Sequence, residues 1–419
     1  MKAIDHYNAG LYNYVLNTKN KNTIVAYQHF EEAANLGYAD AYYFLGRFYG
    51  IGDGVSLDQE KAMELYQKGA ALGSKKCNFQ IGLMYALGSG REKDQDTAQN
   101  LFKESYSDLV KEAKNNDPVS IHIIGAYYYY GFYVQRYIFS AIEWFLKSAE
   151  LGFSDSQYML GMIYETIGEK EQLEKAEEYY LLAAKQGHPY ALFALGVNRL
   201  EENLYSDAVF YLEQAAKQNY ALAAYTLGYY YHDKKPDKKN EAFEWFMVAA
   251  KQGHAEAEYY IGLYYHFGYG VNKNIEKAIE WYEKAALKKD KNALYHLAMI
   301  LINEEEKDME VIRKLLEQAA ALEHPNAQYN LGVMYHKGEG VEKNINRAFF
   351  WYEKAAKANL AIAQYNLGML YYEGIAVEKS EEKALEYWQK AADQGLEPAI
   401  KLVNSIKNYE TLQKSPWQS

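Results

Sequence analysis

The hydrophobic positions along this chain follow a unit of about 36 residues, in which one helical pattern is followed by a turn and then by a second helical pattern. In the unit around Gly262, apolar residues in 255–265 recur four apart and predict one buried face of a first helix. Residues 267–271 hold two glycines, which let the chain reverse. Asn274 is then placed to cap a second helix over 275–287, which has one bulky and one small-residue stripe. Each unit is therefore predicted to be a helix-turn-helix hairpin.

The unit recurs along almost the whole chain, and one small residue in the first helix marks it each time. The markers are Gly46, Gly82, Gly125, Gly161, Gly196, Gly228, Gly262, Ala298, Gly332 and Gly368. The same step taken back from Gly46 reaches Gly10, which indicates a degenerate opening unit and about eleven units in all. Because glycine inside a helix costs about 1 kcal/mol relative to alanine, we expect a neighbouring helix to approach closely at each marker.

Residues around the markers repeat as a fuller motif, seen best at 327–356. They are Ala327, Tyr329, Leu331, Gly332, Tyr335, Gly338, Gly340, Val341, Ala348, Trp351, Tyr352, Lys354, Ala355 and Ala356, with Arg347 in a place usually held by lysine. This motif resembles the Sel1-like repeat, a relative of the tetratricopeptide repeat, over roughly residues 5 to 400. The resemblance implies an all-α, right-handed superhelical α-solenoid of about eleven repeats, whose first helices line the concave side. It implies no reaction, because members of the family act as adaptors and scaffolds, and some resemble the immunity partners of bacterial toxins.

The spacing of the units predicts the domain organisation. Residues 1–37 form a degenerate N-terminal capping repeat, and 118–395 a continuous arc. Gly82 and Gly125 lie 43 residues apart, so 38–117 should contain an extended second helix, with a joint near 103–118 where polar, turn-prone residues gather. Residues 396–419 are expected to form a capping helix and a loose tail.

Composition favours a protein partner over the other classes of ligand. The chain has 419 residues, of which 49% are hydrophobic and 24% charged, so a sizeable core can form. Its net charge of −11 disfavours nucleic acid and anionic membrane surfaces. A single cysteine, Cys77, cannot close a disulfide within the chain. The first residues lack the uninterrupted apolar stretch of a secretory signal, so we expect no secretory leader. We expect no membrane insertion and a cytoplasmic location.

Candidate chemistry is sparse. There is no His-Glu-x-x-His motif and no clustered Cys/His spacing, so neither a metal nor a cofactor is expected. His188, His254 and His324 stand at the entry to first helices, where a turn-forming role is expected. The paired acids lie on the exposed side of second helices, and the sequence therefore predicts no catalytic residues and no enzyme activity.

The 44 tyrosines provide the strongest functional signal. Aromatic residues recur three positions before the marker, and varied residues occur one and four positions after it. By analogy with tetratricopeptide units, these three columns point into the concave groove. The predicted partner-binding residues are Tyr43, Arg47, Tyr129, Tyr158, Met162, Tyr225, Tyr229, His232, Tyr259, Leu263, His266, Tyr295, Tyr329, His336, Tyr365, Met369 and Tyr372. A second interpretation of the first column is that it packs between successive first helices.

These observations predict a non-catalytic scaffold or adaptor that binds another protein, or an extended peptide, in a tyrosine-rich concave groove. A narrower alternative is a bacterial immunity or inhibitor protein that neutralises a secreted toxin. A third is a binder of glycans or cell-wall fragments, because aromatic platforms also stack on sugars.

Overall fold

The computed structural model describes residues 1–16, 22–55 and 57–414. Over these residues the secondary structure is helical, without strands. The chain divides into two compact units, Met1–His254 and Ala255–Ser419, which we call the first and second units. The boundaries expected from the spacing of the repeats stay predictions.

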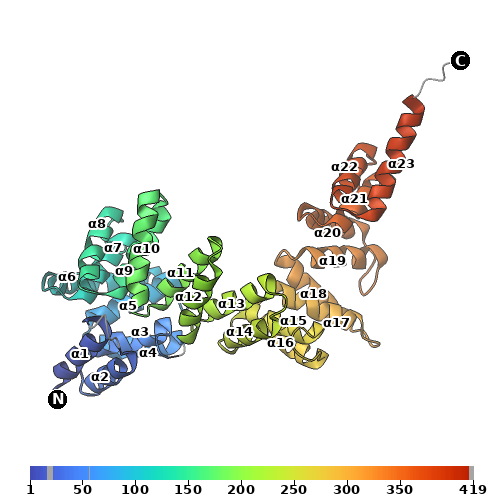
Figure 1. The fold of residues 1–419 in the computed structure, drawn as a ribbon. Helices are drawn as coiled ribbons and strands as arrows, with labels where there is room; N and C mark the ends of the chain where they lie inside the picture. The colour runs from blue at the N-terminus through green and yellow to red at the C-terminus, as the bar shows by residue number, and fades with distance from the viewer. Residues whose placement is uncertain (17–21, 56, 415–419) are drawn as a thin grey trace. The chain divides into compact units, whose positions relative to one another are not determined.

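The first unit contains seven pairs of helices in its described residues (Figure 1). They are α1 (Ala3–Leu11), with a short π-helical turn at Tyr12–Leu16, and α2 (Thr23–Asn35); α3 (Ala41–Ile51) and α4 (Gln59–Ala71); α5 (Lys75–Leu87) and α6 (Gln95–Lys114); α7 (Pro118–Tyr130) and α8 (Ile138–Glu150); α9 (Ser154–Ile167) and α10 (Lys170–Lys185); α11 (Pro189–Glu201) and α12 (Tyr205–Lys217); and α13 (Ala221–Lys234) and α14 (Lys239–Lys251).

The second unit contains four more pairs and a final helix in its described residues. They are α15 (Ala255–Phe267) and α16 (Ile275–Leu287); α17 (Lys291–Ile302) and α18 (Met309–Ala321); α19 (Pro325–Lys337) and α20 (Ile345–Lys357); α21 (Ala361–Glu373) and α22 (Glu381–Asp393); and α23 (Glu397–Lys414). Within each unit a helix packs mainly against the one before it and the one after it, which is the architecture of an α-solenoid. The expected all-α repeat fold is confirmed.

The marker glycines allow close contact between the two helices of a pair, as predicted. A Cβ atom at Gly262 would lie 2.6 Å from the ring of Tyr282 in α16, and one at Gly332 would lie 2.5 Å from the ring of Tyr352 in α20. Real Cβ atoms essentially never approach other atoms so closely. The aromatic side chain of the second helix therefore occupies the space that a larger marker would need.

Side-chain caps begin the second helices where the sequence indicated. Asn274 accepts a hydrogen bond from the backbone N–H of Lys277 at 2.8 Å, and Asn344 accepts one from Arg347 at 3.0 Å. These caps satisfy backbone donors that have no partner within the helix. Local sequence therefore sets the start of these two second helices.

Glycines with positive φ end several first helices and turn the chain towards the second. In the α15–α16 connection, Gly268 has φ +77° and Gly270 has φ +63°. Tyr133 and Ala376 stand in the place of Gly270 in their own repeats, with φ of 58° and 65°. A side chain in this left-handed region is strained, because its Cβ approaches the following carbonyl oxygen.

The residues expected to form a joint near 103–118 are mostly helical. The helix α6 has 20 residues and continues to Lys114, and its Leu109 and Ala113 are buried. The surplus residues therefore extend this helix along the core. Asn115 and Asn116 then form the turn before α7. A break in orientation at this turn stays a prediction.

The C-terminal segment agrees in part with expectation. α23 follows the last hairpin, and its Ala399 and Val403 are buried. Residues 415–419 of the predicted tail lie outside the described residues. None of the helices in the described part of the chain combines the length and apolarity needed to cross a membrane.

Candidate interaction surface

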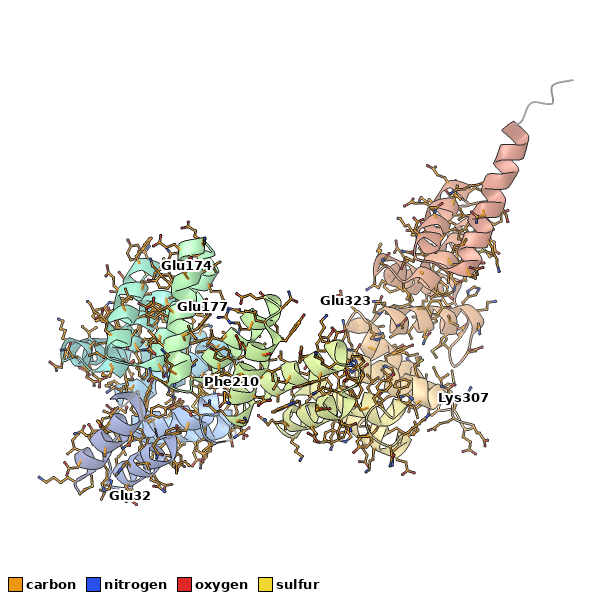
Figure 2. All side chains as sticks on the ribbon, in the orientation of Figure 1. Glu32, Glu174, Glu177, Phe210, Lys307 and Glu323 are labelled. Atoms are coloured by element: carbon orange, nitrogen blue, oxygen red, sulfur yellow. The ribbon has the colours of Figure 1, made fainter. Side chains whose placement is uncertain are left out.

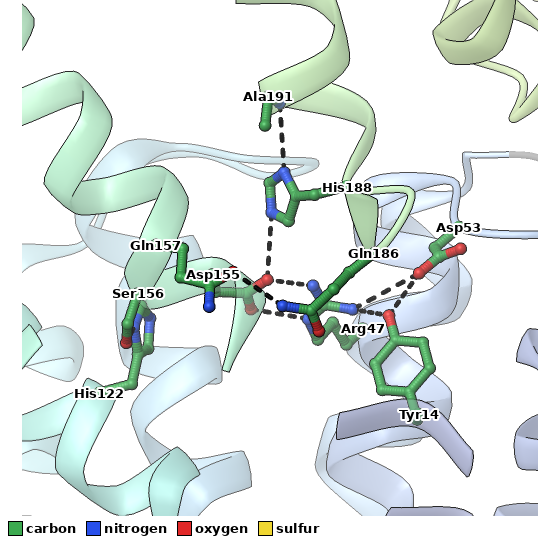
Figure 3. Close-up of polar contacts among 10 residues, drawn as sticks. All are labelled: Tyr14, Arg47, Asp53, His122, Asp155, Ser156, Gln157, Gln186, His188 and Ala191. Atoms are coloured by element: carbon green, nitrogen blue, oxygen red, sulfur yellow. Dashed lines mark hydrogen bonds and ion pairs between the residues drawn. The ribbon is translucent and has the colours of Figure 1, made fainter. Parts of the chain in front are cut away.

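Tyr43 and Arg47 do not line an open groove, which corrects the expectation for this part of the chain. Tyr43 is 1% exposed and Arg47 is 5% exposed. The Arg47 Nε atom donates a hydrogen bond to Asp155 Oδ2 at 2.8 Å, and its other nitrogens contact Asp155 and the hydroxyl of Tyr14 (Figure 3). Asp53 lies 3.9 Å from the same guanidinium. Side chains from other repeats of the first unit therefore cover this face.

This buried cluster is held together by charge. Burial alone would raise the pKa of Asp155, but Arg47 and His188 outweigh it and hold the pKa well below its usual range. Burial alone would lower the pKa of Arg47, and Asp155 and Asp53 raise it above its usual value. Both partners stay ionised. The ion pair links α3 to the first turn of α9, across 108 positions of sequence.

The aromatic column three residues before the marker packs between successive repeats. Tyr158 stacks on His188 with ring centroids 5.0 Å apart, and Tyr295 stacks on His324 at 4.4 Å. Tyr225 and His254 form the same contact at 4.6 Å. These tyrosines are half-buried.

Two of the three entry histidines, His188 and His324, have the turn-forming role expected of them. The Nδ1 atoms of His188 and His324 accept hydrogen bonds from the backbone N–H groups of Ala191 and Ala327, at 3.3 and 3.2 Å. These two histidines are therefore the N-caps of α11 and α19. Their rings stack on a tyrosine of the preceding repeat, so the first column contributes at least partly to packing.

The remaining predicted residues of the first column, Tyr259, Tyr329 and Tyr365, are also half-buried. Tyr259 stacks on Tyr282 at 5.9 Å, and Tyr329 lies 5.7 Å from Tyr352. Tyr365 receives a hydrogen bond on its backbone oxygen from the Trp388 indole at 3.2 Å. These contacts join the first helix of a repeat to its own second helix.

The residues four positions after the marker contact the aromatic side chain of the second helix that packs against the marker glycine. His266 lies within hydrogen-bonding distance of the Tyr282 hydroxyl at 3.3 Å, and His336 within 3.4 Å of the Tyr352 hydroxyl. The Tyr372 ring lies 5.4 Å from Trp388.

The same column in the first unit makes looser ring contacts. The rings of Tyr129 and His232 lie 6.5 and 6.4 Å from Phe145 and Phe246. Burial, and then Lys239, lowers the pKa of His232. Burial, and then Lys273, lowers that of His266 in the second unit.

From the fifth repeat onward, the residues one position after the marker are partly exposed. Met162, Leu263 and Met369 are half-buried, and Tyr229 on α13 is 45% exposed. In the second unit, the residues one and four after the markers form a surface that we call the first-helix face. Its members are Leu263, His266, Met299, Ile302, Val333, His336, Met369 and Tyr372.

A hollow of about 650 Å³ lies on the first-helix face, and we call it the first-helix hollow. Met299 and Ile302 of α17 and Val333 of α19 contribute to its lining, together with Met309 of α18. Lys307, which lies in the loop between α17 and α18 (Figure 2), is also among the lining residues. Methionine side chains adapt to irregular partners, which suits a binding surface.

Sequence reasoning did not single out Met299 and Ile302. A signal was available, because they stand one and four residues after the marker Ala298. What the spacing could not show was the hollow itself. It forms because α18 presents Leu316 where neighbouring second helices present Tyr282 and Tyr352, so a ring is missing from the wall.

The stacked hairpins and their open first-helix face define a helical-repeat protein of the solenoid class. A family model described as the Sel1 repeat matches ten segments: 6–38, 39–74, 75–107, 118–153, 154–188, 189–220, 221–254, 255–290, 325–360 and 361–396. The chain belongs to the Sel1 repeat family. Proteins built from this repeat are generally scaffolds for protein interaction.

Similar proteins come from several lineages. The chitin synthase regulator SKT5 of Saccharomyces cerevisiae is 28% identical over 234 residues, which are 51% of this chain and 34% of the relative. The E3 ubiquitin-protein ligase component HRD3B of Arabidopsis thaliana, associated with endoplasmic-reticulum degradation, is 27% identical over 221 residues, or 48% and 36% of the two chains. The chain thus spans about a third of the length of these relatives.

A solved structure extends the similarity to almost the whole chain. The protective antigen c5321 of uropathogenic Escherichia coli has a TM-score of 0.63 and 28% identity. The match covers 98% of this chain and 88% of that protein, which displays the same repeat fold.

Proposed function

We propose that the chain is a non-catalytic scaffold that binds a segment of a partner protein on the first-helix face of the second unit. The observation that carries this proposal is the first-helix hollow, an apolar depression of about 650 Å³ where residues one and four after consecutive markers meet. Binding sites are typically concave and mostly apolar, with a few polar groups that fix orientation. Lys307 and Glu339 supply polar groups among the lining residues.

Exposed aromatic side chains on the same face support the proposal. Tyr372 is 45% exposed, and His336 is also exposed. Tyrosine offers a large contact area with few rotatable bonds, which suits the hot spots of an interface. The predicted residues of the first column, such as Tyr295 and Tyr329, are half-buried and would mainly pack beneath these exposed side chains, with only part of each ring available to the partner.

The test is affinity capture from the source organism with the full chain as bait, followed by titration with the purified partner. Val333→Glu places a charge on the wall of the first-helix hollow. Phe350→Glu is the matched control, because Phe350 is 46% exposed on α20, outside the lining of the hollow. We expect Phe350→Glu to bind as the parent does and Val333→Glu to bind at least about tenfold more weakly.

Circular dichroism verifies that both variants keep the helical content of the parent. Equal affinity of the parent and Val333→Glu would place the partner elsewhere and contradict the proposal. A tight complex with a single secreted toxin would identify the narrower immunity function. Binding of saccharides on a glycan array, without a protein partner, would favour the glycan alternative.

A further inference from the structure

A second apolar hollow, of about 510 Å³, lies on the other side of the same repeat. It is lined by α16, α17 and α18, and we call it the α16–α18 groove. In α17 its lining residues Leu294, Leu297 and Leu301 are three or four apart and share one face. Met299 and Ile302, which line the first-helix hollow, lie on the opposite face of that helix. The two hollows are therefore separate surfaces.

The neighbouring repeats close the corresponding position with two cation–π contacts each. In the α15–α16 repeat, Lys277 lies over the ring of Tyr265 at 5.3 Å, and Lys284 lies over the ring of Trp281 at 3.9 Å. A cation over an aromatic face is attracted by the ring quadrupole. Each contact therefore covers the surface of the repeat with an aromatic ring and places a positive charge over that ring.

The two repeats that follow α17–α18 have the same two contacts. One joins the two helices of a pair: Arg347 over Tyr335 at 5.3 Å, and Lys383 over Tyr371 at 5.2 Å. The other lies within the second helix: Lys354 over Trp351 at 5.8 Å, and Lys390 over Tyr387 at 5.3 Å. Three repeats of the second unit thus keep this surface covered and charged.

The α17–α18 repeat replaces all four residues of these contacts. Leu301 and Val311 stand in the places of the first ring and its cation, and Leu315 and Gln318 in the places of the second ring and its cation. All four replacements line the α16–α18 groove. The Sel1 repeat model also passes over this segment, matching 255–290 and resuming at 325. Compared with its neighbours, the α17–α18 repeat therefore lacks two aromatic rings and two positive charges at a single surface.

The groove is apolar, open and bordered by carboxylates. Leu287 is 86% exposed and Val311 is 41% exposed on its walls. Glu283 is the charged residue among the lining side chains, and Glu280 and Glu276 continue the same edge of α16, one and two turns earlier. Within the residues that the structure describes, none of these three glutamates forms an ion pair.

Three nearby cations are engaged elsewhere. Lys284 lies over Trp281, Lys288 pairs with Glu258 at 2.7 Å, and Lys314 pairs with Glu310 at 2.9 Å. The acidic edge is therefore left to attract a positive group, and the net charge of the chain, −11, acts in the same direction.

We propose that the α16–α18 groove binds the apolar face of an amphipathic helix of a partner protein, with a lysine or arginine of that helix beside Glu283. Helices of this kind place apolar side chains three, four and seven residues apart into a groove between other helices. The partner would restore what this repeat lacks, namely apolar cover for Leu301 and Leu315 and a positive charge near the acidic edge. The inference is independent of the first-helix face.

The test begins with a repaired variant, Val311→Lys/Leu315→Trp/Gln318→Lys, which copies the α15–α16 repeat at three positions. A phage library of random peptides, each about sixteen residues long, is selected on the immobilised full chain and depleted on the repaired variant. Survivors are synthesised and titrated by fluorescence polarisation. We expect them to carry the helical apolar spacing with lysine or arginine on one edge, and to gain helical circular dichroism when bound.

Two further variants locate the binding. Glu283→Lys should weaken the survivors about three- to tenfold through charge repulsion, whereas Val333→Glu in the first-helix hollow should leave their affinity unchanged. A thermal melt of the repaired variant at or above that of the parent shows that lost binding is not lost folding. Absence of survivors, survivors without the apolar spacing or enriched in acidic residues, or an affinity unaffected by Glu283→Lys would overturn the proposal.

Discussion

The residue one position after the marker lies in different surroundings in the two units. We compare the second repeat of the first unit with the repeats of the second unit. Arg47, one residue after its marker, is 5% exposed and paired with Asp155, whereas Leu263 and Met369 at that position are only half-buried. Both positions point to the same side of a first helix. Register therefore fixes the direction of a side chain, and what lies above it decides whether it can meet a partner.

The cores of the two units also differ. Buried residues from Tyr7 to Ile163 form one continuous hydrophobic cluster in the first unit. In the second unit, smaller clusters join neighbouring hairpins, such as the one that contains Tyr352 of α20 and Leu370 of α21. The first repeats thus share one continuous core, whereas the core of the second unit is divided among neighbouring hairpins.

The largest expected effect comes from breaking the buried ion pair. Arg47→Met leaves the Asp155 carboxylate buried without its cation, which should lower the free energy of unfolding by about 3–5 kcal/mol. Leu263→Ala, at the same register position in the second unit, should cost less than the roughly 2–5 kcal/mol of a fully buried leucine. Guanidinium unfolding followed by circular dichroism measures both.

The double variant Arg47→Met/Asp155→Leu is the control for this prediction. Replacing both charges with apolar side chains removes the unpaired carboxylate, so much of the lost stability should return. Equal stability of Arg47→Met and the parent would show that the cluster is not a structural link.

The next effect concerns the marker that both units share. Gly332→Ala places a Cβ atom about 2.5 Å from the Tyr352 ring and should destabilise by about 1–3 kcal/mol through overpacking. Tyr352→Leu in the same chain should recover part of this loss, because the α17–α18 repeat naturally combines Ala298 with Leu316. A double-mutant cycle measures the coupling, and simple additivity would mean that the ring and the marker do not compete for space.

A smaller effect is expected from acid. Burial lowers the pKa of His296 and of His324 to about 4, while an unfolded histidine titrates near pH 6.5. The unfolded chain therefore takes up protons first as the pH falls, and stability declines between about pH 6.5 and pH 4. The free energy of urea unfolding should be lower at pH 5 than at pH 7.

His296→Phe/His324→Asn is the matched variant for the pH effect. Asparagine keeps an N-cap at the start of α19, and neither replacement titrates in this range. The difference between pH 7 and pH 5 should shrink in this variant. An unchanged difference would assign the pH dependence to other groups.

The smallest effect concerns the connection between α21 and α22. Ala376 has φ +65°, so Ala376→Gly should relieve strain and stabilise by less than about 1 kcal/mol. Ala358→Gly is the control, because Ala358 has an ordinary negative φ of −78° and glycine there should destabilise. Melting temperatures that change in the same direction in both variants would contradict the strain at Ala376.

Much of the local structure could be predicted from the sequence. The cap at Asn274, the helix that follows it and the close contact at Gly262 all depend on residues within one repeat. The histidine caps at His188 and His324 are local as well. A repeat cannot bury its apolar face alone, so its spacing also indicates that hairpins stack.

Predictions about distant contacts were less successful. Near 103–118 the spacing predicted an extended second helix with a joint; most of the segment extends α6, since Leu109 and Ala113 pack against the core, and the joint stays a prediction. The α16–α18 groove was also missed, although the aliphatic residues Leu301, Val311 and Leu315 were visible in the sequence. Their meaning appears only when the cation–π contacts of the neighbouring repeats show what these residues replace.

The sequence by itself determined the repeat, its two helices, several of their caps and the close contact between them at the marker. Each of these arises from interactions within one short segment of the chain. Tertiary structure decided which repeated positions are buried and which are open. Arg47 and Asp155 lie 108 positions apart, and no local pattern indicates that they meet. Exposure depends on the side chains that fold over a position, and that information is spread across several repeats.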